Sequence, residues 1–186
     1  MTKVYRIVTD VNHYQYFFAE HEEEEVKLLT DCIPRATTWE PPSVYVYNPR
    51  HKAGDFYSFH GCSLITNPRA TAVLASFLEM AGELLPLPYN GQEYSLLNIT
   101  ECINCRDRER TTWLKDETGA NVLPVQYVFH RNRFAESRLF KIPETYGGEI
   151  LVVDLDQDPD EEFKSAVELA ELEGLCFHEL WSDQSS

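Results

Sequence analysis

The chain has 186 residues, of which 43% are hydrophobic and 25% charged, so it is long and apolar enough to bury one core. Its formal net charge is −15, with 31 acidic and 16 basic residues. A field of that sign repels nucleic acid and anionic membranes and attracts basic proteins. We therefore expect a basic protein partner, with no direct nucleic-acid contact and no membrane partner.

The apolar runs and the cysteines indicate where such a chain resides. No apolar run approaches the roughly 20 residues of a membrane-spanning helix, and the first residues lack the apolar stretch of a secretory signal. The cysteines are odd in number and scattered, at Cys32, Cys62, Cys102, Cys105 and Cys176. They do not form the pattern of a disulfide-stabilised secreted scaffold. We expect a soluble protein of the reducing cytoplasm.

The first sixty residues are rich in aromatic and β-branched side chains, which favour strands. The predicted strands lie at residues 4–8, 14–18, 43–47 and 55–59. The first two could pair with each other. Between them and the third strand, residues 20–25 are too charged to be buried, and three prolines make residues 34–42 extended or irregular.

The clearest element is a helix that begins after Asn67. Asn67 can cap it, and Pro68 can occupy its first position, where a missing N–H costs nothing. The apolar residues at helical spacing are Ala70, Val73, Leu74, Phe77, Leu78 and Ala81. Gly82 is a plausible end. Residues 84–88 then lead out of the helix to a predicted strand at 94–100.

The second half predicts more strands and one further helix. The strands lie at residues 122–129, 138–142, 150–153 and 175–180. Asp158, Pro159 and Glu161 form a capping box for a helix with Phe163 and Val167 on its buried face, ending before Gly174. Many strands with about two main helices predict a single α+β domain over residues 1–186, with a mostly antiparallel sheet.

Cys102 and Cys105 form a CxxC pair, the one motif with obvious chemistry. A structural zinc site needs about four ligands, and no second such pair exists. A thioredoxin-type pair would open a helix after a strand, whereas the charged residues 106–110 follow here. We expect ordinary cysteines, no metal and no cofactor. A metal or redox protein built on Cys102 and Cys105 is the alternative.

Other catalytic signatures are missing from the sequence. The histidines show no metal-binding spacing, and the chain has no nucleophile elbow, phosphate loop or dinucleotide fingerprint. We therefore expect no enzyme. Arg106, Arg108 and Arg110 alternate with acids, and we expect them to form local ion pairs, each of little value.

Two acidic runs are candidates for partner binding. Their residues are Glu22, Glu23, Glu24 and Glu25, and Asp154, Asp156, Asp158, Asp160, Glu161 and Glu162. The second run is not a calcium loop, because Pro159 interrupts it and the glutamate of the twelfth position is a serine. It can equally be an acidic helix start, where the helix dipole favours negative charge. Exposed aromatic residues, Trp39, Trp113 or Trp181, could anchor a partner.

Several short stretches follow one another in a characteristic order. They are Gly54-Asp55-Phe56, Asn67-Pro68-Arg69-Ala70, residues 83–87, residues 93–107 with the CxxC pair, Leu139-Phe140-Lys141-Ile142, and residues 162–181. In this order, over about residues 54–181, the chain resembles the immunity-11 family of bacterial polymorphic toxin systems. The resemblance implies a cytoplasmic protein that protects its producer by binding a toxin. It carries over no catalytic residue.

These observations lead to one expected function and two alternatives. We expect an immunity protein that neutralises a cognate basic toxin, for example a nuclease with a basic cleft, by stoichiometric binding. A homodimer is compatible with this function. The alternatives are the metal or redox protein and a regulatory interaction module.

Overall fold

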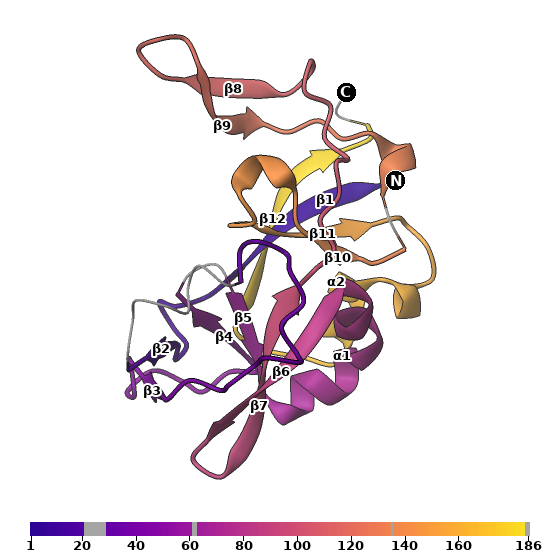
Figure 1. Ribbon diagram of the computed structural model, residues 1–186. Helices are drawn as coiled ribbons and strands as arrows, with labels where there is room; N and C mark the ends of the chain where they lie inside the picture. Colours follow the sequence, from indigo (N-terminus) through magenta and orange to yellow (C-terminus); the bar gives the residue numbers. More distant parts are fainter. Residues whose placement is uncertain (21–28, 61–62, 135, 185–186) are drawn as a thin grey trace.

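The computed structural model describes residues 1–20, 29–60, 63–134 and 136–184. It confirms the α+β class, with two α-helices and mostly antiparallel strands (Figure 1). Within the described residues, no helix is long and apolar enough to cross a membrane.

A four-stranded antiparallel sheet has the order β10-β11-β1-β12. Its strands are β1 (Lys3–Thr9), β10 (Leu139–Phe140), β11 (Ile150–Asp154) and β12 (Leu175–Ser182). Lys3 is opposite both Asp154 and Ser182, so the first strand lies between two strands from the end of the chain. The prediction that residues 14–18 pair with residues 4–8 was therefore wrong. Residues 17–19 form β2, which belongs to another sheet.

The six-stranded sheet has the order β3-β2-β4-β5-β7-β6, antiparallel except where β2 meets β4. Its strands are β2 (Phe17–Ala19), β3 (Val44–Val46), β4 (Phe56–Phe59), β5 (Ser63–Thr66), β6 (Gly82–Tyr89) and β7 (Gln92–Ile99). Strands β5 and β6 were not predicted from the sequence. Asn90 and Gly91 have positive φ angles of 48° and 75°, which suits the tight turn that joins β6 to β7.

Helix α1 (Pro68–Ala81) confirms the predicted helix at both ends. The Asn67 side chain accepts a hydrogen bond from the Ala70 amide at 2.8 Å, as an N-cap does. Gly82 follows the helix, and a Cβ there would lie 2.1 Å from the Asn98 carbonyl oxygen. Only glycine therefore permits this close approach of the chain to β7.

The predicted second helix is divided in two. Asp158 caps a short 3-10 helix, η4 (Pro159–Glu161), instead of the α-helix itself. Glu162 then returns to an extended conformation, and α2 (Phe163–Leu169) begins after it. Phe163 and Val167 of α2 pack with Leu74 and Leu78 of α1 in the main core.

A third sheet is the hairpin of β8 (Thr112–Lys115) and β9 (Asn121–Gln126). The hairpin stands away from both larger sheets, at the top of Figure 1. Strand β9 overlaps the strand predicted at residues 122–129, whereas β8 was not predicted from the sequence. Two further 3-10 helices, η2 (Arg131–Arg133) and η3 (Pro143–Thr145), follow the hairpin along the chain.

Candidate functional site

The segment that leads into the hairpin turns Arg106 toward the interior. The Asp107 amide donates to the Val128 carbonyl at 2.8 Å, and the His130 amide donates to the Cys105 carbonyl at 2.7 Å. The Asp107 carboxylate accepts the amide of Arg110 at 3.1 Å, which turns the chain again. The Arg106 side chain is consequently 0% exposed.

Glu144 of η3 is the ion-pair partner of this buried arginine. One Glu144 oxygen lies 3.1 Å from an Arg106 Nη and 3.1 Å from the Arg108 Nε. The Glu144 side chain is 4% exposed, whereas the Arg108 side chain is 71% exposed. Burial lowers the pKa of Arg106 from its usual value, and Glu144 opposes that change. The expectation of local ion pairs was wrong for Arg106 and Arg108, because their shared partner Glu144 is distant in the sequence. The pair with Arg106 is also buried, so its loss would be costly.

Trp113 of β8 covers the other side of Arg106. The guanidinium carbon lies 4.0 Å from the centre of a Trp113 ring, a cation–π geometry. Trp113 is partly buried by this contact. Arg106 thus contacts the hairpin through Trp113 and η3 through Glu144, and holds the two together.

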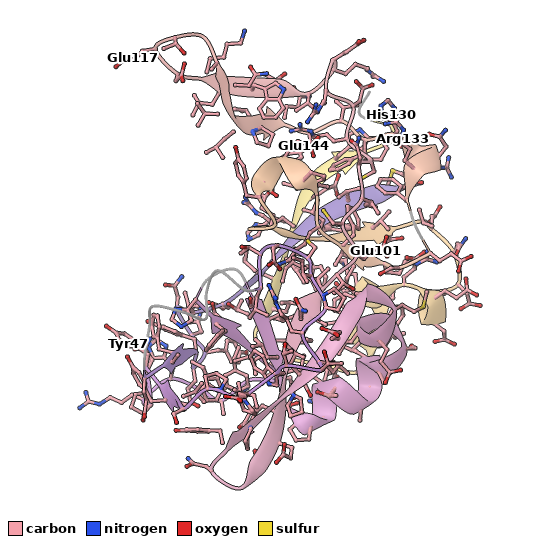
Figure 2. The ribbon with its side chains drawn as sticks, viewed as in Figure 1. Tyr47, Glu101, Glu117, His130, Arg133 and Glu144 are labelled. Carbon is pink, nitrogen blue, oxygen red and sulfur yellow. The ribbon has the colours of Figure 1, made fainter. Side chains whose placement is uncertain are left out.

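Two hollows lie beside the hairpin, and both are lined by Glu144 and Tyr146. The first has a volume of about 450 Å³ and is lined also by Arg106, Arg108 and Trp113. The second, of about 440 Å³, lies between β9 and residues 144–149. Figure 2 shows Glu144 at the base of the hairpin and Glu117 near its tip.

Tyr146 is held outward between these hollows by an unusual turn. Its φ angle is 51°, a left-handed conformation that is uncommon for a non-glycine residue. Gly147 follows at φ 68°, and a Cβ there would lie 1.9 Å from the Thr30 carbonyl oxygen. The Tyr146 side chain is left 87% exposed.

The hairpin itself exposes apolar side chains. The exposed fractions are 54% for Leu114, 46% for Val122, 55% for Leu123 and 65% for Val125. We call these four side chains and Tyr146 the hairpin surface. Leu123 and Val125 share one face of β9, with Leu114 opposite Leu123, whereas Val122 lies on the other face. Contiguous exposed apolar surfaces often mark sites of protein interaction.

The acidic residues predicted to bind a partner differ in their exposure, and four of them are not described by the structure. Glu22, Glu23, Glu24 and Glu25 lie outside the described residues. In the second run, Asp156, Asp158, Asp160 and Glu161 are exposed and Asp154 is partly buried. Asp156 pairs with the N-terminal amine. This second run therefore offers four exposed carboxylates on one loop.

Glu162 does not belong to that exposed surface. It is 2% exposed and accepts hydrogen bonds from the Leu155 amide at 3.0 Å and the Gln157 amide at 3.2 Å. The Arg138 Nε lies 3.4 Å from its other oxygen. Burial raises the pKa of Glu162 above its usual value, against the effect of these partners. The choice of Glu162 as a partner-binding residue is corrected: it fixes the 155–157 turn from inside.

Among the three tryptophans, Trp181 is buried and cannot be an exposed anchor, whereas Trp39 and Trp113 are both partly buried. Trp181 is 8% exposed and packs in a core with Phe129 and Phe140. Trp39 is partly buried, and its indole N–H donates to the Pro86 carbonyl at 2.9 Å. Trp113 lines the first hollow beside the hairpin, together with Val122 and Tyr146.

The cysteines of the CxxC pair lie in different surroundings. Cys105 is 0% exposed in a hydrophobic core, and this burial raises the pKa of its thiol to about 12. Cys102 is an exposed residue, and partial desolvation of its thiol, together with the neighbouring Cys32 thiol, raises its pKa to about 11. Within the described residues, no group of three or more His, Cys, Asp or Glu could hold a metal ion.

No family model and no curated protein matches this chain. Its function must therefore be argued from the surfaces described above, from the net charge and from the resemblance noted in the sequence.

Proposed function

We propose that this chain is a non-enzymatic, cytoplasmic binding protein that neutralises a basic protein toxin by forming a stoichiometric complex. The observation that carries this proposal is the hairpin surface. Four apolar side chains of β8 and β9 are 46–65% exposed on an element that stands away from both larger sheets. A monomeric protein rarely leaves such a surface uncovered unless it binds another molecule.

The net charge of −15 supports a basic partner. Complementary charge accelerates association, up to about 10⁸–10⁹ M⁻¹s⁻¹ at low salt, and repels acidic competitors. The exposed carboxylates of Asp156, Asp158, Asp160 and Glu161 contribute to this field. The net charge would then accelerate association with the partner, and the apolar hairpin surface would slow its dissociation.

The resemblance to the immunity-11 family supports a toxin as the partner. It covers about residues 54–181, a range that includes the hairpin, Glu144 and Tyr146. An immunity protein acts by binding its toxin and blocking the toxin's activity, so it needs a binding surface and no catalytic group. The tightest known protein complexes include nuclease–immunity pairs.

Growth rescue tests the proposal. The chain is co-expressed in a sensitive host with the toxin-like product of the gene adjacent to its own, and growth and co-purification are measured. We expect growth to be restored and the two proteins to co-purify. An unrelated acidic protein of similar size serves as the control. Growth arrest by a toxin of confirmed activity, despite full expression of this chain, would reject that toxin as its partner.

A further inference from the structure

We infer that the hollow between β9 and residues 144–149 is an anchor site, which receives one apolar or aromatic side chain from a protruding segment of the toxin. This inference rests on the proposed function and names the surface used. The hollow has a volume of about 440 Å³, within the range of pockets that hold small ligands. We call it the anchor hollow.

Apolar groups form most of its walls. Leu123, Pro124 and Val125 of β9 line one side, and Tyr146 lines the other, with Leu180 of β12 also in the lining. Tyr146 and Val125 are 87% and 65% exposed, so a partner can reach both walls. Aromatic side chains seated in such pockets dominate the energetics of many interfaces.

The charged residues of the anchor hollow already have partners within the chain. Glu149 bonds to Arg6 at 3.1 Å and to the Tyr127 hydroxyl at 2.7 Å. Glu144 is shared by two arginines. Both carboxylates are thus already paired with arginines, so the hollow favours an apolar occupant over a charged one.

The anchor hollow is formed before any partner binds. Arg106 holds Trp113 on the hairpin side and Glu144 on the η3 side, and its own side chain is completely buried. Arg106 does not line the anchor hollow, but it joins β8 to η3 beside the hollow and so supports the hairpin next to it. A preformed site loses less conformational entropy on binding, which strengthens the complex.

Strand addition to the hairpin is a poor alternative. Pro124 lies in the middle of β9 and has no N–H to donate to an added strand. The pairing of β8 with β9 is also irregular at two points, between Thr112 and Trp113 and between Leu114 and Lys115. Proline and bulges are the devices that prevent edge-to-edge pairing. The partner therefore docks through side chains.

A second copy of the chain is also a poor occupant. Each copy carries a net charge of −15, so two copies repel each other on approach. A basic toxin gains from the same field. The charge therefore favours a basic protein, here the proposed toxin, over a second copy as the occupant of the anchor hollow.

Complementary charge acts mainly on the association rate, and an apolar anchor contact acts mainly on the dissociation rate, so rate measurements can test the anchor hollow. The toxin domain used for growth rescue is immobilised, and association and dissociation rates are measured for the wild-type chain, Val125→Ser and Tyr146→Ala. Loss of an anchor contact acts mainly on dissociation. We expect both variants to dissociate about tenfold faster or more, with little change in the association rate. The matched control is Leu169→Ser on α2, where Leu169 is 70% exposed.

The possible outcomes separate the two proposals. Unchanged dissociation of both hairpin variants, with a tight wild-type complex, would overturn the anchor hollow and leave the proposed function intact. Equal acceleration in Leu169→Ser would also overturn it. If the wild-type chain does not bind the toxin domain, the proposed function fails for this partner, and the anchor site fails with it. Urea unfolding of each variant excludes loss of the fold as the cause.

Discussion

The Arg106 guanidinium lies 4.0 Å from the centre of a Trp113 ring and 3.1 Å from the Glu144 carboxylate. One buried charge therefore joins the β8–β9 hairpin to η3. Burying a charge is costly unless it is paired, so the removal of one partner destabilises more than the pair itself stabilises. Substitutions at Arg106 or Glu144 should therefore lower the stability of the fold strongly.

Replacing Arg106 tests this joint. In Arg106→Met the buried Glu144 loses its buried partner and keeps only the exposed Arg108. We expect the free energy of unfolding to fall by about 3 kcal/mol, measured by urea denaturation. The control is Arg110→Met, at an exposed position, for which a change below about 0.5 kcal/mol is expected. Equal losses in the two variants would show that the buried pair has no special role.

Glu83 gives a pH-dependent prediction. Desolvation is the largest single influence on its pKa and raises it, but hydrogen bonds from the Arg35 amide, the Asn98 side chain and the Ala36 amide outweigh it. Its pKa is therefore below the usual 4.5 in the folded state. Ionised Glu83 therefore stabilises the folded state fully at pH values above the pKa that Glu83 has in the unfolded chain. This stabilisation is lost as the pH falls through the lower pKa that Glu83 has in the folded chain.

Glu83→Gln removes that titration. We expect the variant to be less stable by about 1 kcal/mol near neutral pH, because two amides lose a charged acceptor. Between neutral and strongly acidic pH, it should lose less stability than the wild-type chain. Urea unfolding at both pH values measures this difference. Identical acid losses for the two proteins would contradict a lowered Glu83 pKa.

The metal alternative has its own test. A structural zinc site in a small domain contributes on the order of 10 kcal/mol to folding. Since no three ligand residues are grouped together in the described parts of the chain, we expect no stoichiometric zinc and no change of melting temperature with a chelator. A thiol reagent should label Cys102 in the folded chain and Cys105 only after unfolding. Bound zinc at one equivalent, released with loss of stability, would favour the alternative function.

Charge reversal tests the two acidic runs. Asp158, Asp160 and Glu161 are exposed, and their triple replacement by lysine should slow association with the toxin and weaken its salt dependence. The same replacement of Glu22, Glu23, Glu24 and Glu25 is predicted from the sequence to act similarly. The dissociation rate should change little in either charge-reversed variant. An unchanged association rate would exclude the run concerned from the binding surface.

The elements that could be predicted are those with local signals. Helix α1 combines a capping Asn67, a first-turn Pro68 and a terminal Gly82 in one continuous stretch. Strand β6, in contrast, could not be predicted from local signals, because its two prolines are typical of a loop that follows a helix. They are tolerated since β6 lies at the edge of the six-stranded sheet, beside β7 alone. The Asn90-Gly91 turn was the available signal for this hairpin.

The candidate site depends on contacts that no local pattern contains. Arg106 was chosen as one of several alternating charges, and nothing near it in the sequence identifies Glu144 as its partner. The tryptophans show the same difficulty, because composition does not separate the buried Trp181 from the partly exposed Trp113. The signal for Tyr146 was weak: the two glycines after it indicate a turn but not an exposed ring.

The most direct test of stoichiometric neutralisation is a titration of toxin activity in vitro. A fixed amount of active toxin domain is mixed with increasing amounts of this chain, and the residual toxin activity is measured. A binding protein should reduce the activity linearly, to zero at a fixed stoichiometric ratio. Complete loss at a small fraction of one equivalent would mean that the chain acts catalytically. Full toxin activity at a large excess of the chain would contradict neutralisation of that toxin.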